Sequence, residues 1–183
     1  MELRNTDMVE AAGRIIIRSG TDALSIEELS HEMGGDYHPL SSFFKNNADI
    51  VVMVLESLEK EIKQLLSDSL HLEGASDKEL QNLFESLNNL FGLKPYYLSI
   101  VFSKELAEKN PAIQEIMLRI KSAAKIHLMH IINHGNNQKE HKTIQTTASL
   151  ANKILGSFRL FMNEQRVINR MVRDIEILKN TQD

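Results

Sequence analysis

Apolar residues recur every three or four positions along most of the chain, which is the spacing of one face of an amphipathic α-helix. The alternation of apolar and polar residues that marks a β-strand is nearly absent. Glycine, proline and asparagine interrupt the helical pattern at intervals, as they do at helix ends. The sequence therefore predicts an all-α protein of about nine helices, of which the first three are short.

The first two helices have recognisable end signals. Gly20 follows a cationic turn, and a left-handed glycine commonly ends a helix at such a place. Ser25 and Glu28 have the spacing of a capping box, which predicts the start of a second helix. The pair Gly34-Gly35 ends that helix after about two turns. We therefore expect a short second helix followed by a tight turn.

A third short helix is expected directly after this turn. Asp36 can cap it, and Pro39 is tolerated in its first turn because no intrahelical donor is needed there. Leu40, Phe43 and Phe44 are expected to form its buried side. Two short helices joined by a glycine turn cross at a steep angle, so that the second can enter a DNA major groove. The first fifty residues thus have the outline of a helix-turn-helix.

The remaining residues predict six further helices. The fourth is long, at about 47–71, and the sixth covers 95–106. An asparagine followed by a proline at 110–111 predicts the start of the seventh, which runs to about residue 134. The eighth and ninth helices meet near Asn163. The long helices are expected to form the main hydrophobic core.

Residues between positions 9 and 50 share the order and spacing of a known family pattern. They are Val9-Glu10-Ala11-Ala12, Gly20, Leu24-Ser25-Ile26, Leu29-Ser30, Met33-Gly34, Leu40, Phe43-Phe44-Lys45 and Asp49-Ile50. On these residues the sequence resembles the TetR family of bacterial transcriptional regulators. Beyond them only the helical character and the length agree. The resemblance implies a helix-turn-helix DNA-binding domain at 1–46, the head, and a helical ligand-binding and dimerisation domain at 47–183, the body.

The resemblance also implies which residues contact operator DNA. The expected contacts are Ser25, Tyr37, His38, Ser41, Ser42 and Lys45. Their hydroxyl, imidazole and amine groups can bind phosphates or base edges. The head departs from the family's usual residues at several positions. Gly35-Asp36 replaces a Val-Ser pair, Ser41 replaces a tyrosine, and Asn47 replaces a lysine.

The charge of the head leaves a second interpretation open. Four cations stand against nine anions between residues 1 and 50, a net charge of −5. Because cations that neutralise phosphates supply much of the affinity for DNA, such a head should bind weakly unless its cations are well placed. The alternative is a dimeric helical ligand-binding or interaction module that kept the fold and lost sequence-specific DNA binding. A cationic ridge from Arg4, Arg14 and Lys45 would favour DNA, and an acidic surface would favour the module.

The fifth to seventh helices lie where TetR-like proteins bind an inducer. The resemblance therefore implies an unknown small-molecule ligand held by a mostly apolar pocket with a few polar groups. The candidate ligand-binding residues are Tyr96, Tyr97, Phe102, Met117 and His127. Aromatic and methionine residues at helical spacing also occur in any ordinary core, so each candidate has that second interpretation.

The eighth helix carries two apolar stripes, which calls for a partner on each side. One stripe repeats at spacings of three and four, as in a helix–helix seam. The resemblance implies a homodimer in which the last two helices pair with their symmetry mates. The expected interface residues are Ala148, Ala151, Leu155, Phe158, Met162, Ile168, Met171 and Ile175. The alternative is a helix buried within a monomer.

Three histidines fall on one helical face and raise the question of a metal site. His127, His130 and His134 are spaced by three and four residues, which suits zinc or nickel. The neighbourhood offers no cysteine and only Glu140 as a carboxylate. A solvated polar face explains the histidines as well, so no metal site is predicted.

Several function classes find no support in the sequence. There is no cysteine, and hence no disulfide or thiol chemistry. The apolar runs are too short to cross a bilayer, and the first residues do not form a signal peptide. Glycine-rich phosphate loops, Gly-x-Ser-x-Gly and His-Glu-x-x-His motifs are all missing. We therefore expect a cytoplasmic protein that is not an enzyme, needs no cofactor and does not bind membranes.

Overall fold

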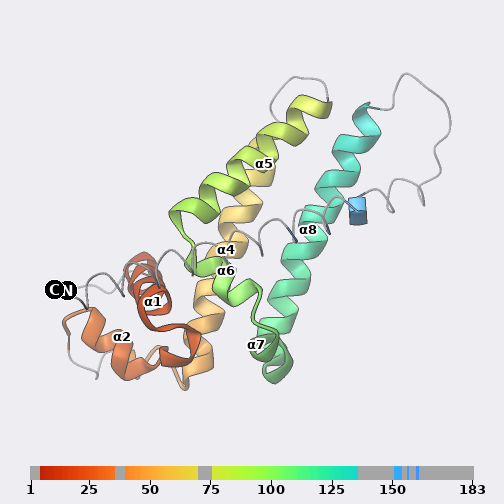
Figure 1. Ribbon diagram of the computed structural model, residues 1–183. Coiled ribbons are helices and arrows are strands. Elements are labelled where there is room, and N and C mark those ends of the chain that lie inside the picture. Colours follow the sequence, from red (N-terminus) through yellow and green to blue (C-terminus); the bar gives the residue numbers. More distant parts are fainter. Residues whose placement is uncertain are drawn as a thin grey trace, which may run out of the picture.

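The computed structural model describes residues 5–35, 40–69 and 76–135, together with 151–153, 156 and 160. Within these residues every regular element is helical (Figure 1). The elements are α1 (Asn5–Ser19), η1 (Thr21–Ala23), α2 (Ile26–Glu32), α4 (Asn47–Ser69), α5 (Ser76–Leu93), α6 (Tyr96–Val101), α7 (Lys104–Lys109) and α8 (Pro111–Gly135). The predicted all-α class is confirmed. None of the helices described here is long and apolar enough to cross a membrane.

Capping side chains set the starts of two helices where the sequence predicted them. The Ser25 Oγ accepts a hydrogen bond from the backbone N–H of Glu28 at 3.1 Å and so begins α2. The Asn110 Oδ1 accepts one from the backbone N–H of Ala112 at 2.9 Å, with Pro111 at the first position of α8. Each cap satisfies a backbone donor that the helix itself leaves unpaired.

The prediction of one helix across 95–106 is wrong. The chain forms two short helices here, α6 and α7, and Phe102 ends the first of them. The Ser103 Oγ accepts a hydrogen bond from the backbone N–H of Leu106 at 3.4 Å and so begins α7. Neither glycine nor proline marks this break, and the apolar spacing continues across it. The sequence pattern therefore hid the break.

The head contains two further departures from the sequence prediction. Phe43 was expected in the core, but 57% of it is exposed, whereas Leu40 and Phe44 are buried. The short 3₁₀ turn η1 follows Gly20 and was not predicted. Gly20 does adopt the expected positive φ, +84°, and Gly34 in the helix-turn-helix turn has φ +66°. A residue with a side chain would be strained at both positions.

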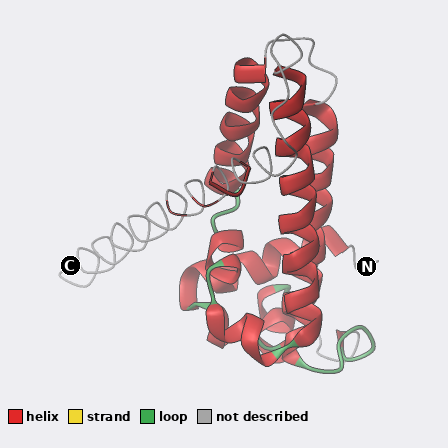
Figure 2. Cartoon of the chain, turned by 90° about the vertical axis from the view of Figure 1, so that its right-hand side faces the viewer, coloured by secondary structure: helices red, strands yellow, loops and turns green. Residues whose placement is uncertain are grey.

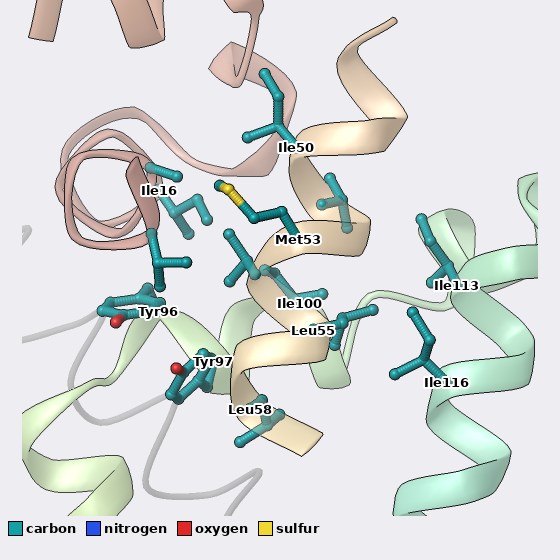
Figure 3. Close-up of a cluster of buried hydrophobic side chains, with 14 of the residues drawn as sticks. Ile16, Ile50, Met53, Leu55, Leu58, Tyr96, Tyr97, Ile100, Ile113 and Ile116 are labelled. Atoms are coloured by element: carbon teal, nitrogen blue, oxygen red, sulfur yellow. The ribbon is translucent and has the colours of Figure 1, made fainter. Parts of the chain in front are cut away.

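One hydrophobic core runs from the head into the body. The long helix α4 contacts α1 at the head and α5, α6 and α8 in the body. Figure 2 shows the long helices running side by side, with the shorter helices gathered at one end. Figure 3 shows how Ile50 and Met53 of α4 face Ile16 of α1, whereas Leu55 faces Ile113 of α8. Head and body thus share buried side chains.

An ion pair also links α4 to α8. Two nitrogens of Arg119 bind both carboxylate oxygens of Glu59, at 2.9 and 2.7 Å, and the Nζ of Lys63 lies 2.8 Å from the same carboxylate. Glu59 is nearly buried. The hydrogen bond from Arg119 lowers the pKa of Glu59 to about 2. Since the carboxylate is satisfied on both oxygens, its burial is compatible with a stable fold.

Candidate functional site

Ser25, at the start of α2, is one of the predicted DNA contacts. Ser25 is the cap of this helix, and the next residue, Ile26, donates its backbone N–H to the Asn47 Oδ1 at 3.3 Å. The hydroxyl oxygen of Ser25 is engaged with the helix, which leaves the hydroxyl proton to offer to a phosphate oxygen. Glu27 and Glu28 follow directly, and their charges oppose an approaching phosphate.

The predicted reading helix is described only from Leu40 onward, where residues 41–43 form a turn instead of continuing the helix. Tyr37 and His38 lie outside the described residues. Ser41, Ser42 and Lys45 are exposed, as a DNA contact requires. Two buried anchors, Leu40 and Phe44, hold this segment against the core, and the backbone N–H groups of Phe43 and Phe44 both donate to the Leu40 carbonyl at 3.0 Å. The exposed Phe43 lies among these residues and was missed because its spacing suggested the core.

Lys45 stands beside the carboxylate that begins α4. Its backbone N–H donates to the Asp49 Oδ2 at 2.7 Å, and the N–H of Asn46 donates to the same oxygen at 3.2 Å. In return, the Asn46 Oδ1 accepts the backbone N–H of Asp49 at 3.2 Å. This reciprocal cap fixes the backbone at Lys45. It also places a negative charge close to the cation expected to bind DNA.

Two arginines of α1 are paired with glutamates of α2. The Arg14 Nε lies 2.6 Å from the Glu32 Oε1, and Arg18 binds Glu32 at 2.8 Å and Glu28 at 3.0 Å. The hydrogen bond from Arg14, followed by the one from Arg18, lowers the pKa of Glu32. The hydrogen bond to Glu32 raises the pKa of Arg18. We call these four residues the arginine–glutamate cluster.

The arginine–glutamate cluster determines how much positive charge the described part of the head leaves for DNA. Three cations occur there, and the cluster occupies two of them, Arg14 and Arg18. Arg14 therefore adds no cationic ridge beside the reading segment, while Lys45 remains exposed. Arg4 lies outside the described residues. Pairing over 10 to 18 positions has no periodic signature, so the sequence could not show it.

The two candidate tyrosines are buried at the junction of head and body. The Tyr97 hydroxyl donates to the Glu61 Oε1 at 2.6 Å, and the Tyr96 hydroxyl donates to the Glu10 Oε1 at 3.3 Å. Burial raises the pKa of both phenols, with neighbouring charges adding to the effect. Figure 3 shows Tyr96 beside Ile16 and Tyr97 near Leu58. Both are already hydrogen-bonded core residues, and a role for them in ligand binding stays a prediction.

His127 is a buried polar residue of the body. Its Nε2 lies 2.7 Å from the Ser69 Oγ, whose hydroxyl is also 2.9 Å from the Leu66 carbonyl. If the single hydroxyl proton goes to that carbonyl, His127 donates from Nε2 and keeps Nδ1 as an acceptor. Burial, reinforced by the nearby His130, lowers the pKa of His127, which favours the neutral ring. A neutral ring with a basic nitrogen can bind a donor group of a ligand.

The other ligand-site candidates are apolar and partly buried. Phe102 and Met117 pack at the edge of the core, as do Leu87 and Leu90 of α5 and Ile120 of α8. Together with the polar His127, these residues are of the types expected in a mostly apolar ligand site, and their role in ligand binding stays a prediction.

A hollow on α4 differs from the predicted ligand site in having a charged and polar lining. It has a volume of about 400 Å³ and is lined by Glu56, Glu59, Lys60, Lys63 and Gln64. None of the predicted ligand-binding residues lines it. Its charged and polar rim does not suit an apolar inducer.

Two of the three histidines have described side chains, and these differ in burial. His127 is buried, whereas His130 is exposed, and the side chain of His134 lies outside the description. The described residues hold no group of three potential metal ligands. Of the predicted dimer residues, Ala151 alone is described, and it is fully buried. The remaining seven residues, 148, 155, 158, 162, 168, 171 and 175, lie outside the description.

Comparison with known proteins establishes the fold. No protein-family model and no curated protein sequence matches the chain. A TetR transcriptional regulator from Legionella pneumophila has a similar structure, with a TM-score of 0.76, 13% identity and coverage of 100% of this chain and 98% of that chain. The fatty acid degradation regulator FadR from Bacillus halodurans has a TM-score of 0.75, 12% identity and coverage of 97% and 95%. The regulator FadR from Bacillus subtilis, in complex with stearoyl-CoA, has a TM-score of 0.72, 16% identity and coverage of 94% and 97%. The chain therefore has the fold of TetR-type regulators along almost its whole length.

Proposed function

We propose that the protein is a TetR-like transcriptional regulator that binds operator DNA as a homodimer and is released by a small-molecule inducer. The observation that carries this proposal is the fold shared with solved transcriptional regulators over nearly the whole of both chains. A fold alone does not fix a function, so the residues of the head must also fit DNA. The absence of enzyme motifs from the sequence agrees with a regulatory role.

The exposed residues of the reading segment support DNA binding. Ser41, Ser42 and Lys45 lie on the surface, while Leu40 and Phe44 hold the segment in place. Rigid anchoring matters because a base contact needs a side chain held within a small range of positions. Tyr37 and His38 would contribute the remaining contacts to phosphates or bases, in accordance with the resemblance.

The inducer is proposed to be an amphipathic molecule with a large apolar part. The partly buried apolar residues of α5 and α8 would contact that part, and His127 would bind a donor group. The Bacillus subtilis regulator was solved with stearoyl-CoA, a molecule of this general kind. Binding that favours one separation of the two heads over another would change operator affinity.

A second function is favoured by the arginine–glutamate cluster. Because Glu28 and Glu32 occupy both α1 arginines, the described head offers DNA little positive charge. A dimeric ligand-binding or interaction module with this fold would need no such charge. Under that function the body would bind its ligand and the heads would not select a DNA sequence.

Selection of binding sites from a random DNA library with the full chain separates the two functions. A regulator should enrich a two-fold symmetric sequence whose half-sites lie about one helical turn apart. Lys45→Ala should weaken binding to the enriched sequence, while Lys121→Ala, which removes the same charge from α8, should not. Enrichment of no sequence over several rounds would contradict the regulator and favour the module.

A further inference from the structure

Helix α1 is in close contact with α6 of the body at Gly13. A Cβ atom at this position would lie 2.5 Å from two ring carbons of Tyr96. Real side chains do not approach so closely, so the ring of Tyr96 can pack directly against α1 at residue 13 only because that residue is glycine. Figure 3 shows Tyr96 on this side of α6, next to α1. A glycine inside a helix lowers its stability, and this contact gives it a specific purpose.

Polar groups surround this contact on both helices. Glu10 lies one turn before Gly13 and accepts a hydrogen bond from the Tyr96 hydroxyl at 3.3 Å. The Lys94 Nζ lies 3.5 Å from Glu10 and 2.9 Å from Glu61 of α4. Desolvation opposes the charge of Lys94, but the two carboxylates outweigh it, and the pKa of Lys94 is raised. Three helices therefore meet through one lysine and one tyrosine.

We propose that Gly13, Tyr96, Glu10 and Lys94 form a joint that fixes the orientation of the head on the body. This inference rests on the proposed function, because the orientation matters for the spacing of two heads on DNA. Helix α1 packs against α4 through buried side chains, and the contact with α6 holds the head on the body at a second place. Tyr96 and Lys94 are thus positioning residues for the DNA-binding surface.

The joint also defines a route between ligand and head. Tyr97, next to Tyr96, is fully buried in the body and donates to Glu61 of α4. Since Tyr96 belongs to α6 and contacts α1 at Gly13, a shift of α6 would change this contact and with it the position of α1.

Variants of the full chain test the joint through the spacing of DNA half-sites. Tyr96→Phe keeps the ring and removes the bond to Glu10, while Gly13→Ala forces the ring away. Gly92→Ala is the control, because Gly92 lies in a helix and has no neighbour within 4 Å of a Cβ atom there. Affinity is measured for duplexes whose half-sites are at the best separation and displaced by one base pair.

If the joint fixes the head, the wild type and Gly92→Ala should bind best to the duplex with the best half-site separation. Gly13→Ala should reduce that preference by roughly fivefold, the lower end of typical coupling between sites. Tyr96→Phe should reduce it less. Loss of stability alone would weaken binding at all separations equally. An unchanged preference in both joint variants, at equal folding, would overturn the inference.

Amide hydrogen exchange decides the inference even if the protein selects no DNA. In the full chain, Gly13→Ala and Tyr96→Phe should speed exchange in α1 and α2, and leave α8 as protected as in Gly92→Ala. Exchange in α1 that matches the control would contradict the joint. Absence of DNA selection by the wild type would contradict the proposed function instead, so the two failures are distinguishable.

Discussion

The head and the body both pair arginine with glutamate, but the side chains of the head pairs are more exposed. In the body, Arg119 binds Glu59 where the carboxylate is nearly buried between α4 and α8. In the head, 55% and 53% of the Arg14 and Arg18 side chains are exposed, against 42% for Arg119, and 14% of Glu32 is exposed, against 9% for Glu59. An ion pair contributes less to stability the more it is exposed to solvent. We therefore expect the body pair to stabilise the fold more than the head pairs, which also neutralise two arginines at the surface of the head.

This difference matters for function because the head is the proposed DNA-binding surface. Arg14 and Arg18, two potential phosphate contacts, are paired with glutamates of the head. Recognition of a DNA sequence would therefore depend on hydroxyl groups, backbone groups and Lys45. Binding should accordingly be weaker and less sensitive to salt than binding by a head rich in free cations. The contrast can be tested by removing matched residues from the two regions.

The largest effect should come from the body pair. Arg119→Met removes both hydrogen bonds to Glu59, and we expect a loss of about 2 kcal/mol in the free energy of unfolding, reduced from the buried-pair range by the exposure of Arg119. Urea unfolding followed by circular dichroism measures it. Arg18→Met in the head is the matched control. Equal losses in the two variants would remove the distinction between the pairs.

The Ser69–His127 contact should have the next largest effect. Ser69→Ala leaves a buried imidazole nitrogen without its partner, which should cost about 1–2 kcal/mol at pH 8. The pKa of His127 is lowered in the fold, so the folded chain resists protonation and loses stability as the pH falls below about 6.5. Unfolding at a series of pH values should show this loss in the wild type. The loss of stability with falling pH should be smaller in His127→Gln. An equal loss in the two proteins would contradict the assignment of this pH dependence to His127.

Glu59 gives a second pH dependence, at more acidic values. Its pKa is lowered to about 2, so the fold is stabilised above the ordinary value near 4.5 and loses this contribution as the pH falls toward 2. Glu59→Gln should flatten the loss of stability between these values, compared with the head variant Glu32→Gln. If the loss of stability at acidic pH is unchanged in Glu59→Gln, other carboxylates dominate acid unfolding.

Lys45 provides a smaller test on the DNA side of the comparison. Lys45→Ala should lower affinity for a selected operator uniformly across sequences and reduce the salt slope by about one for each head. Arg14→Ala should leave the slope almost unchanged, because Arg14 is bound to Glu32. Anisotropy titrations at several salt concentrations measure both. A larger change for Arg14 than for Lys45 would show that the cluster opens on DNA.

The smallest effect is expected for the head pairs. Arg18→Met should change the free energy of unfolding by less than about 1 kcal/mol, since the pair is exposed to solvent and screened by salt. The same urea experiment measures it. A loss above that of Arg119→Met would mean that the cluster is a main support of the α1–α2 contact.

Features that depend on neighbouring residues could be predicted from the sequence. Ser25 begins α2 and Pro111 begins α8 because a cap or a proline acts within one turn. The apolar stripes of α4 and α8 follow from the helical period. The expected operator contacts at Ser41, Ser42 and Lys45 came from the resemblance; the three residues are exposed, and their contacts with DNA stay a prediction.

Features that depend on distant residues could not be predicted. Gly13 resembles any helix glycine until Tyr96, 83 positions later, is placed against it. The break at Phe102 has no breaker residue, and a helical period continues across it. Arginine–glutamate pairing across two helices gives no periodic signal either. In each case the tertiary contact, rather than the local pattern, decides the outcome.

The most direct test of the account is the affinity of the full chain for DNA upstream of its own gene, compared with a shuffled duplex of the same composition. Fluorescence anisotropy across a range of salt concentrations gives both affinities. A DNA-reading regulator should bind the upstream sequence more tightly, and the salt slope should fall by about two in the Lys45→Ala dimer. Equal affinity for the two duplexes at low salt, repeated with other candidate operators, would contradict a DNA-reading regulator and leave the ligand-binding module.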